Sequence, residues 1–422
     1  MINHNQSIIH VVCFLPTTDQ ILPAAAGAAI SCIKSRRQVF YLASSAIMLE
    51  YPLPNELIEC ILDNLYSDRD TLLNCALVGR AWVTTSQKGI FQRIVLDAPN
   101  SHHEDYVQLT HDFLAANERL VDLFDDKPHL TKFVKTLELR QYEKPSRTRD
   151  ARELQQALQI STANVIRRLS DITNLSIFRL TWSNLNDTLK DALVQAFSAP
   201  LLTRVSLSLV AIPTFAELAS LLTRVKLLKV LKITFLACHN WDIPPPAAPA
   251  ENCVPPRSIH LNELVHFHLV NIRAFTAWFM QDYCPFELSN LQTLELHRSA
   301  TFDYQGTAFM LEYIGANLKE LELQGPYRNH PDFNVVHFGY TPNLESVRLI
   351  SVQQTDSLSP VPFIQSLFEP LLNPSRNKFS LKRLTIDLNI DHVDPMDAHH
   401  QWDMWMLLIN CLPNQSFRYW RM

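Results

Sequence analysis

Glycine is scarce in this chain, with 7 among 422 residues. Loops that cradle phosphate groups need glycine where backbone N–H groups approach the ligand closely, and neither GxGxxG nor GxxxxGK[ST] occurs. The sequence also contains no GxSxG or HExxH arrangement. We therefore expect neither catalytic residues nor a cofactor, and an enzyme is disfavoured.

The chain also lacks a charge imbalance, a cysteine framework and a long apolar run. Its formal net charge of −5 gives no reason to propose nucleic acid or a membrane surface as partner. The eight cysteines are scattered without CxxC, which indicates reduced thiols in a cytoplasmic or nuclear protein. No apolar run reaches the ~18 residues that span a bilayer. Basic residues follow the apolar stretch 21–33 instead of preceding it, which argues against a signal sequence.

Residues 52–96 predict a compact helical unit. Pro54 suits the first turn of a helix, and Asp68 or Asp70 is placed to cap a second helix. Apolar residues recur at helical spacing in the first helix, at Leu57, Ile58, Ile61, Leu62 and Leu65. A unit of about 45 residues buries too little apolar surface to be stable alone, so a partner should cover its remaining apolar faces.

This segment resembles the F-box family, whose pattern is LPxE(L/I), an aliphatic pair, a capped turn and (C/A)xxVxxxW. The matching residues are Leu53, Pro54, Glu56, Leu57, Ile61, Leu62, Leu65, Cys75, Val78 and Trp82. The trailing IFQRIVL is similar to the form common among basidiomycete F-box proteins, while Gly79 stands where the family often has serine.

The resemblance implies that the segment binds a Skp-type adaptor and, through it, a cullin. The contact positions that it implies are Leu53, Pro54, Leu57, Ile61, Leu62, Leu72, Leu77, Val78 and Trp82. Some of these side chains must instead form the unit's own core, and Trp82 is the most ambiguous.

An aliphatic LxxLxL pattern recurs beyond residue 130, and its sets begin at Val134, Leu175, Leu202, Leu228, Leu264, Leu291, Leu318, Leu344 and Leu381. Five of the eight intervals are 26 or 27 residues, within the period of leucine-rich repeats. Helical segments are expected between the sets at 188–197, 214–222, 274–283 and 307–315, with an extra one at 362–372. The asparagine or cysteine of the repeat consensus is mostly missing, so the array is degenerate.

The predicted fold is α/β: a small helical F-box followed by a leucine-rich-repeat-like solenoid, with parallel strands on the concave side and helices outside. The expected divisions are a loose tail at 1–48, the F-box at 49–97, a helical connector at 98–129, the array at 130–396 and a cap at 397–422. A proline-rich insertion interrupts the array at 244–256, and Met48 is a possible functional start.

Charged side chains between and beside the array's leucines are expected on its concave face. They are Arg140, Arg179, Arg204, Lys232, His266, His268, Glu295, His297, Glu320, Glu322, Arg348 and Arg383. Our hypothesis is that this face binds a protein substrate, and the alternative is an ordinary solvated face. The three histidines suit salt bridges to acidic neighbours better than zinc, so no metal site is expected.

These features together predict the substrate-recognition adaptor of a Skp–cullin–F-box ubiquitin ligase. The F-box would bind the Skp adaptor while the repeats bind an unknown protein substrate. The alternative is a protein-interaction scaffold that uses the same array outside a ligase.

Overall fold

The computed structural model describes residues 7–14, 54–66, 68–143, 149–243, 257–265, 272–297, 304–325, 335–354, 360–371 and 380–390. The chain divides into two compact units. One consists of Pro16–Gly89 and is named here the helical unit; the other consists of Met1–Leu15 with Ile90–Met422 and is named the sheet unit.

Three helices account for most of the described part of the helical unit: α1 (Asn55–Asp63), α2 (Arg69–Cys75) and α3 (Arg80–Phe91), whose last two residues belong to the sheet unit. Helix α2 begins where the Asp68 carboxylate accepts a hydrogen bond from the backbone N–H of Thr71 at 3.0 Å. This bond satisfies a donor that would otherwise be orphaned at the helix start, so the predicted cap is confirmed.

Buried aliphatic residues hold the helical unit together. Ile58, Leu62 and Leu72 are almost fully buried. Gly89 allows a close approach, because a Cβ atom there would lie 2.7 Å from Cδ1 of Tyr66. Helix α3 therefore packs against the segment after α1 at a distance that a side chain at position 89 would disturb.

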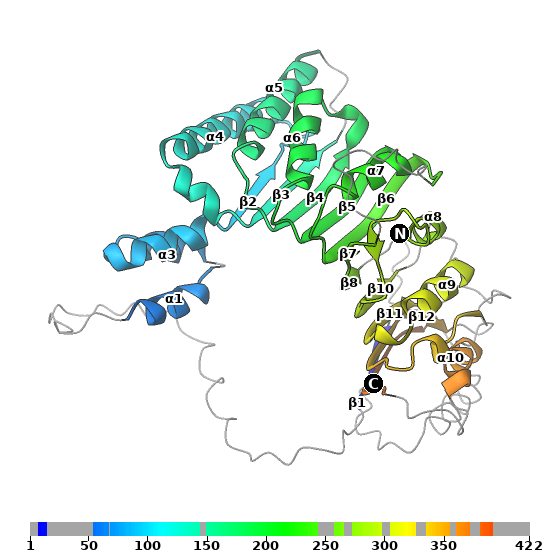
Figure 1. Ribbon diagram of the computed structural model, residues 1–422. Helices are drawn as coiled ribbons and strands as arrows, with labels where there is room; N and C mark the ends of the chain where they lie inside the picture. Colours follow the sequence, from blue (N-terminus) through cyan, green and yellow to red (C-terminus); the bar gives the residue numbers. More distant parts are fainter. Residues whose placement is uncertain are drawn as a thin grey trace. The chain divides into compact units, whose positions relative to one another are not determined.

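The sheet unit contains ten parallel strands whose spatial order follows their order in the chain (Figure 1). They are β2 (Arg93–Asp97), β3 (Thr136–Tyr142), β4 (Asn174–Thr181), β5 (Arg204–Thr214), β6 (Val230–Asn240), β8 (Glu263–Val265), β10 (Thr293–Leu296), β11 (Glu320–Gln324), β12 (Ser346–Gln354) and β13 (Arg383–Ile390). The predicted α/β class with a largely parallel sheet is confirmed. A separate two-stranded sheet pairs β7 (Ile259–His260) with β9 (Phe286–Glu287).

Two strands lie outside the predicted boundaries. Strand β1 (Ser7–Phe14) pairs antiparallel with β13, although the sequence places these residues in a loose tail. Strand β2 pairs with β3, although the sequence includes it in the helical F-box segment. Each of these strands is completed by a neighbour distant in sequence.

Among the described residues, α-helices lie in seven of the nine connections between the parallel strands. They are α4 (Tyr106–Asp126), α5 (Arg149–Ile166), α6 (Asp187–Phe197), α7 (Phe215–Leu222), α8 (Ile272–Phe279), α9 (Tyr304–Ile314) and α10 (Val361–Phe368). Short 3₁₀ turns are η1 (Pro128–Phe133), η2 (Trp182–Asn184), η3 (Gly315–Asn317), η5 (Phe338–Tyr340) and η6 (Glu369–Leu371). The five predicted helical segments of the array correspond to α6 through α10, and α4 lies in the predicted connector.

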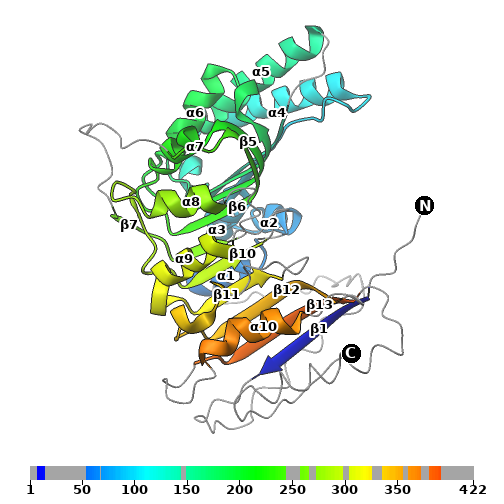
Figure 2. The same cartoon turned by 90° about the vertical axis from the view of Figure 1, so that its right-hand side faces the viewer.

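The α-helices of the sheet unit lie against one face of the large sheet (Figures 1 and 2). Among the described residues no helix of this unit covers the opposite face, which is named here the open face. Alternate strand residues point to the helices and form one continuous core from Ile94 to Leu388. One row of this core is in register across nine strands: Leu137, Leu175, Val205, Leu231, Leu264, Leu294, Leu321, Val347 and Leu384.

The predicted repeat frame is wrong by three residues at two strands. Leu175 and Leu264 fill the second core position of their repeats, so Ile172 and Leu261 fill the first. In β4 the error placed Phe178 in the core, whereas its side chain is 37% exposed. Leu180 stays buried because Arg179 adopts a positive φ of 56°, which shifts the alternation of buried and exposed side chains by one residue while the strand stays in register with its neighbours. Phe267 and Leu269 of the other set lie outside the described residues.

Candidate functional site

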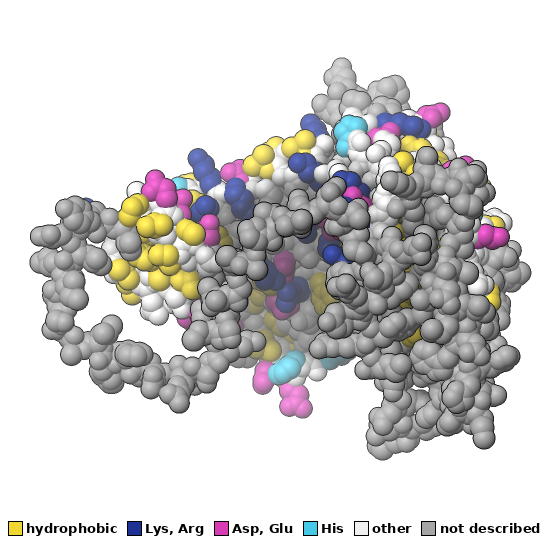
Figure 3. Space-filling view, turned by 90° about the horizontal axis from the view of Figure 1, so that it is seen from below, with side chains coloured by type: hydrophobic (Ala, Val, Ile, Leu, Met, Phe, Trp, Pro, Cys, Tyr) yellow, Lys and Arg dark blue, Asp and Glu magenta, His cyan; other side chains and the backbone are white. Residues whose placement is uncertain are grey.

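Exposed apolar side chains gather on the helical unit (Figure 3). Five of them define what is named here the apolar patch, with exposed fractions between 44% and 85%: Leu57, Ile61, Leu73, Leu77 and Val78. Leu57 and Ile61 lie one turn apart on α1, and Leu77 and Val78 follow α2. Several exposed apolar side chains on so small a unit are typical of a protein-binding site.

The predicted adaptor-binding residues divide between this surface and the core. Leu57, Ile61, Leu77 and Val78 belong to the patch, and Pro54 is exposed. Leu62 and Leu72 are instead fully buried, as expected for part of the set, and they hold the helices together. Trp82 is partly buried. Leu53 lies outside the described residues, and Leu73 is a patch residue that the motif did not indicate.

Charged side chains form bridges between neighbouring strands of the open face. At its N-terminal end, Glu138 on β3 accepts from Arg93 at 2.7 Å and from Arg140 at 2.8 Å. Burial alone would raise the pKa of Glu138, but the bonds from both arginines hold it below its ordinary value. Further along, Lys232 lies 3.6 Å from Glu263 on the next strand.

The C-terminal half of the open face carries a denser network in a hollow of about 390 Å³. Arg348 on β12 bridges two carboxylates: its Nη1 lies 3.3 Å from Glu322, and its Nη2 donates to Asp387 at 2.8 Å. Nε2 of His297 lies 2.7 Å from Oε1 of Glu322. Burial, and then the negative charge of Glu322, raise the pKa of Glu295. Several carboxylates therefore cluster in this half of the face, among them Glu295, Glu322 and Asp387.

Most of the predicted substrate-binding residues lie on or beside the open face. Ten of the twelve are described: Arg140, Arg179, Arg204, Lys232, Glu295, His297, Glu320, Glu322, Arg348 and Arg383. The structure brings His297, Glu322 and Arg348 into contact. Arg179 has a positive φ and lies 3.4 Å from Glu143. His266 and His268 lie outside the described residues.

Three apolar side chains interrupt the charged face, and the sequence did not indicate them as site residues. Phe178, Leu209 and Phe235 lie on the neighbouring strands β4, β5 and β6 and are between 37% and 51% exposed; they are named here the apolar strip. Leu209 and Phe235 each have a φ of 53°, in register with Arg179 and with Gln141 on β3. Non-glycine residues pay of order 1–2 kcal/mol in this region, and such strain clusters at functional sites.

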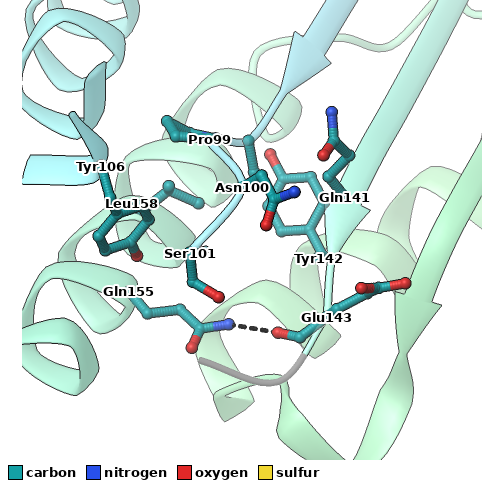
Figure 4. Close-up of a pocket in the computed structure, with 10 residues that line it drawn as sticks. Pro99, Asn100, Ser101, Tyr106, Gln141, Tyr142, Glu143, Gln155 and Leu158 are labelled. Atoms are coloured by element: carbon teal, nitrogen blue, oxygen red, sulfur yellow. Dashed lines mark hydrogen bonds between the residues drawn. The ribbon is translucent and has the colours of Figure 1, made fainter. Parts of the chain in front are cut away.

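A small cavity lies beside the C-terminal end of β3 (Figure 4). Its volume is about 20 Å³, enough for about one water molecule. The Tyr142 hydroxyl, which lies 2.9 Å from Oγ1 of Thr162, and the side chain of Gln155, which donates to the carbonyl oxygen of Glu143 at 2.7 Å, are already hydrogen-bonded. This cavity is too small to be a ligand site.

Cys60, Cys75, Cys238 and Cys284 are free thiols. Burial raises the pKa of Cys284 to about 12, and burial with the nearby Glu217 carboxylate does the same for Cys238. Both therefore stay protonated near neutral pH.

Comparison with known proteins gives no family assignment: no protein-family signature matches the chain, and a search of curated proteins finds no match. Within the described ranges, every helix is too short or too polar to cross a bilayer.

Proposed function

We propose that this chain is a substrate-recognition adaptor of a Skp–cullin–F-box ubiquitin ligase. In this proposal the helical unit is the F-box that binds a Skp-type adaptor. The sheet unit is a leucine-rich-repeat-like solenoid whose open face is concave and binds a protein substrate. Such a protein works in the cytoplasm or nucleus. Its mechanism is proximity, because it holds two reactants together without reacting itself.

The observation that carries the proposal is the apolar patch. Four of its five residues, Leu57, Ile61, Leu77 and Val78, occupy the positions that the F-box resemblance assigns to adaptor contact. Fully burying a side chain of this kind stabilises a complex by about 1.5–3 kcal/mol. Two buried leucines, Leu62 and Leu72, hold the helices that present the patch. The same short segment thus supplies a stable frame and an uncovered apolar surface.

The sheet supports the second half of the proposal. Ten of its strands follow chain order, run parallel and have their helices on one face, which is how stacked repeats arrange themselves. The open face combines bridged charges with the apolar strip. A protein surface can match such a pattern through charge complementarity at its rim and apolar contact at its centre.

The test is a pull-down of the full chain with a purified Skp-type adaptor and cullin. The test variant is Leu57→Asp with Ile61→Asp, which places two charges in the patch. The matched control is Val107→Asp with Leu109→Asp, two exposed apolar residues of α4. We expect the wild type and the control to retain the adaptor and the test variant to lose it.

Failure of the wild type to bind the adaptor would overturn the proposal. Retention of the adaptor without cullin would favour the scaffold alternative, in which the open face works outside a ligase.

A further inference from the structure

We infer that Glu295, His297 and Glu322 form a binding site for a divalent transition-metal ion such as Zn²⁺, at the junction of β10 and β11. This inference does not depend on the proposed function. It revises the expectation from the sequence, which considered His297 only together with His266 and His268 and favoured salt bridges.

The ligand atoms converge because of strand register. Glu295 and His297 are two residues apart at the C-terminal end of β10, so both side chains leave the same face of the sheet. Glu322 lies directly opposite Glu295 on β11. One ligand atom from each of the three residues lies within 4.8 Å of the others. No backbone movement is needed to bring them to one ion.

The contact between His297 and Glu322 requires a proton or a metal ion between its two atoms. Nε2 of the imidazole lies 2.7 Å from Oε1 of the carboxylate. Without a proton or a metal ion, each atom would direct a lone pair at the other. In a tetrahedral zinc site with bonds of about 2.0–2.1 Å, neighbouring ligand atoms are about 3.3 Å apart, so a small side-chain rotation accommodates the ion. A rotation of the Glu295 side chain then brings its carboxylate into the third ligand position.

The surroundings favour a cation and orient a ligand. All three side chains are partly buried, which limits competition from water. The other oxygen of Glu322, Oε2, faces Arg348, which Asp387 also holds. Arg348 therefore fixes the carboxylate without occupying the oxygen that faces His297, in the manner of the outer-shell groups around known metal ligands.

One imidazole and two carboxylates suit zinc and other first-row divalent ions better than Ca²⁺, which prefers an all-oxygen shell. Three protein ligands leave a fourth position for water or a side chain of a binding partner. The site would also link β10 to β11 on a face of the sheet that has no helix among the described residues.

The test is calorimetric titration of the chelator-treated full chain with ZnCl₂ at pH 7.5. The wild type is expected to bind one ion at this site, and His297→Ala and Glu322→Gln are each expected to weaken its affinity at least tenfold. Glu320→Gln is the matched control, because it removes a charge from the same strand outside the ligand set. Its affinity should stay within about twofold of wild type.

Circular dichroism and the urea midpoint without metal establish that each variant folds. Should His297→Ala not fold, Glu295→Gln replaces it, with the same tenfold loss expected. Zinc should also raise the thermal midpoint of the wild type but not that of the ligand variants, since only a native-state site stabilises the fold. Absence of zinc binding by the wild type would overturn the inference and assign the short contact to a proton. Equal affinities in ligand variants and control would do so too.

Discussion

The aromatic cluster around Phe215 gives the sharpest test of the sheet unit's core. Phe215 opens α7 and is fully buried. Its ring packs edge-to-face on Phe275 and on Trp278, with ring centroids 4.8 Å and 5.6 Å apart. It also stacks on Trp241, with a centroid distance of 5.9 Å. These contacts join α7 to α8 and to the residue that follows β6.

We expect Phe215→Ala to lower the free energy of unfolding of the sheet unit by about 3–5 kcal/mol. The cost should lie in the upper part of this range, because three ring pairs are lost and each adds about 0.5–1.5 kcal/mol beyond burial. Phe215→Leu keeps most of the apolar volume and should cost roughly 1–2 kcal/mol. The control is Phe309→Ala on α9, where the ring is 55% exposed, and its effect should stay within about 0.5 kcal/mol.

Urea denaturation followed by tryptophan fluorescence measures these differences, since Trp241 and Trp278 are in contact with the mutated ring. The midpoint should fall while the slope with urea stays unchanged, because the core is one continuous cluster. A loss below about 1 kcal/mol, or one equal to that of the Phe309 control, would refute the packing around Phe215.

Three further predictions concern single interactions. Glu138→Gln should destabilise the sheet unit by about 1–3 kcal/mol at pH 7, because it removes a carboxylate that accepts hydrogen bonds from two arginines. Because the pKa of Glu138 is depressed in the folded state, its contribution to stability is fully present above about pH 4.3 and is lost as the pH falls through the folded pKa. The free energy of unfolding should therefore depend less on pH in the acid range in the variant than in the wild type. Asn186→Ala should cost about 1 kcal/mol, since this side chain caps α6 by accepting from the backbone N–H of Leu189 at 2.8 Å, and thermal denaturation measures it. Leu209→Ile should lower the free energy of unfolding by on the order of 1 kcal/mol, because a β-branched residue is disfavoured at a positive φ. Leu207→Val, in the extended part of the same strand, is the control that changes packing alone.

Much of the fold follows from periodicity. Each repeat brings aliphatic residues back to the same face, and the helices between the strands have their own spacing, so the α/β class and five array helices are predictable. Which residues of a single strand face the core is harder to predict. Leu175, Phe178 and Leu180 satisfy the apolar pattern as well as Ile172, Leu175 and Ile177 do, and the pairing of Leu175 with Leu137 and Val205 on the neighbouring strands decides between them.

The candidate sites show the same division. Leu57 and Ile61 were predictable because a motif fixes their helical face. The apolar strip was not, since Leu209 and Phe235 are exposed in a left-handed backbone conformation that leaves no mark in residue type. The meeting of Glu295 with Glu322 depends on pairing between residues of different repeats, which spacing along the chain suggests but does not fix.

The central claim is that the apolar patch binds a Skp-type adaptor, and a calorimetric titration of the full chain with the purified adaptor measures this directly. The wild type should bind one adaptor per chain, and Leu77→Asp with Val78→Asp should weaken the affinity at least 100-fold, since two apolar contacts of at least about 1.4 kcal/mol each are lost. Leu201→Asp with Leu227→Asp, exposed apolar residues of the sheet unit, should leave the affinity unchanged. A wild type that does not bind, or a patch variant that binds as tightly as this control, would contradict the account.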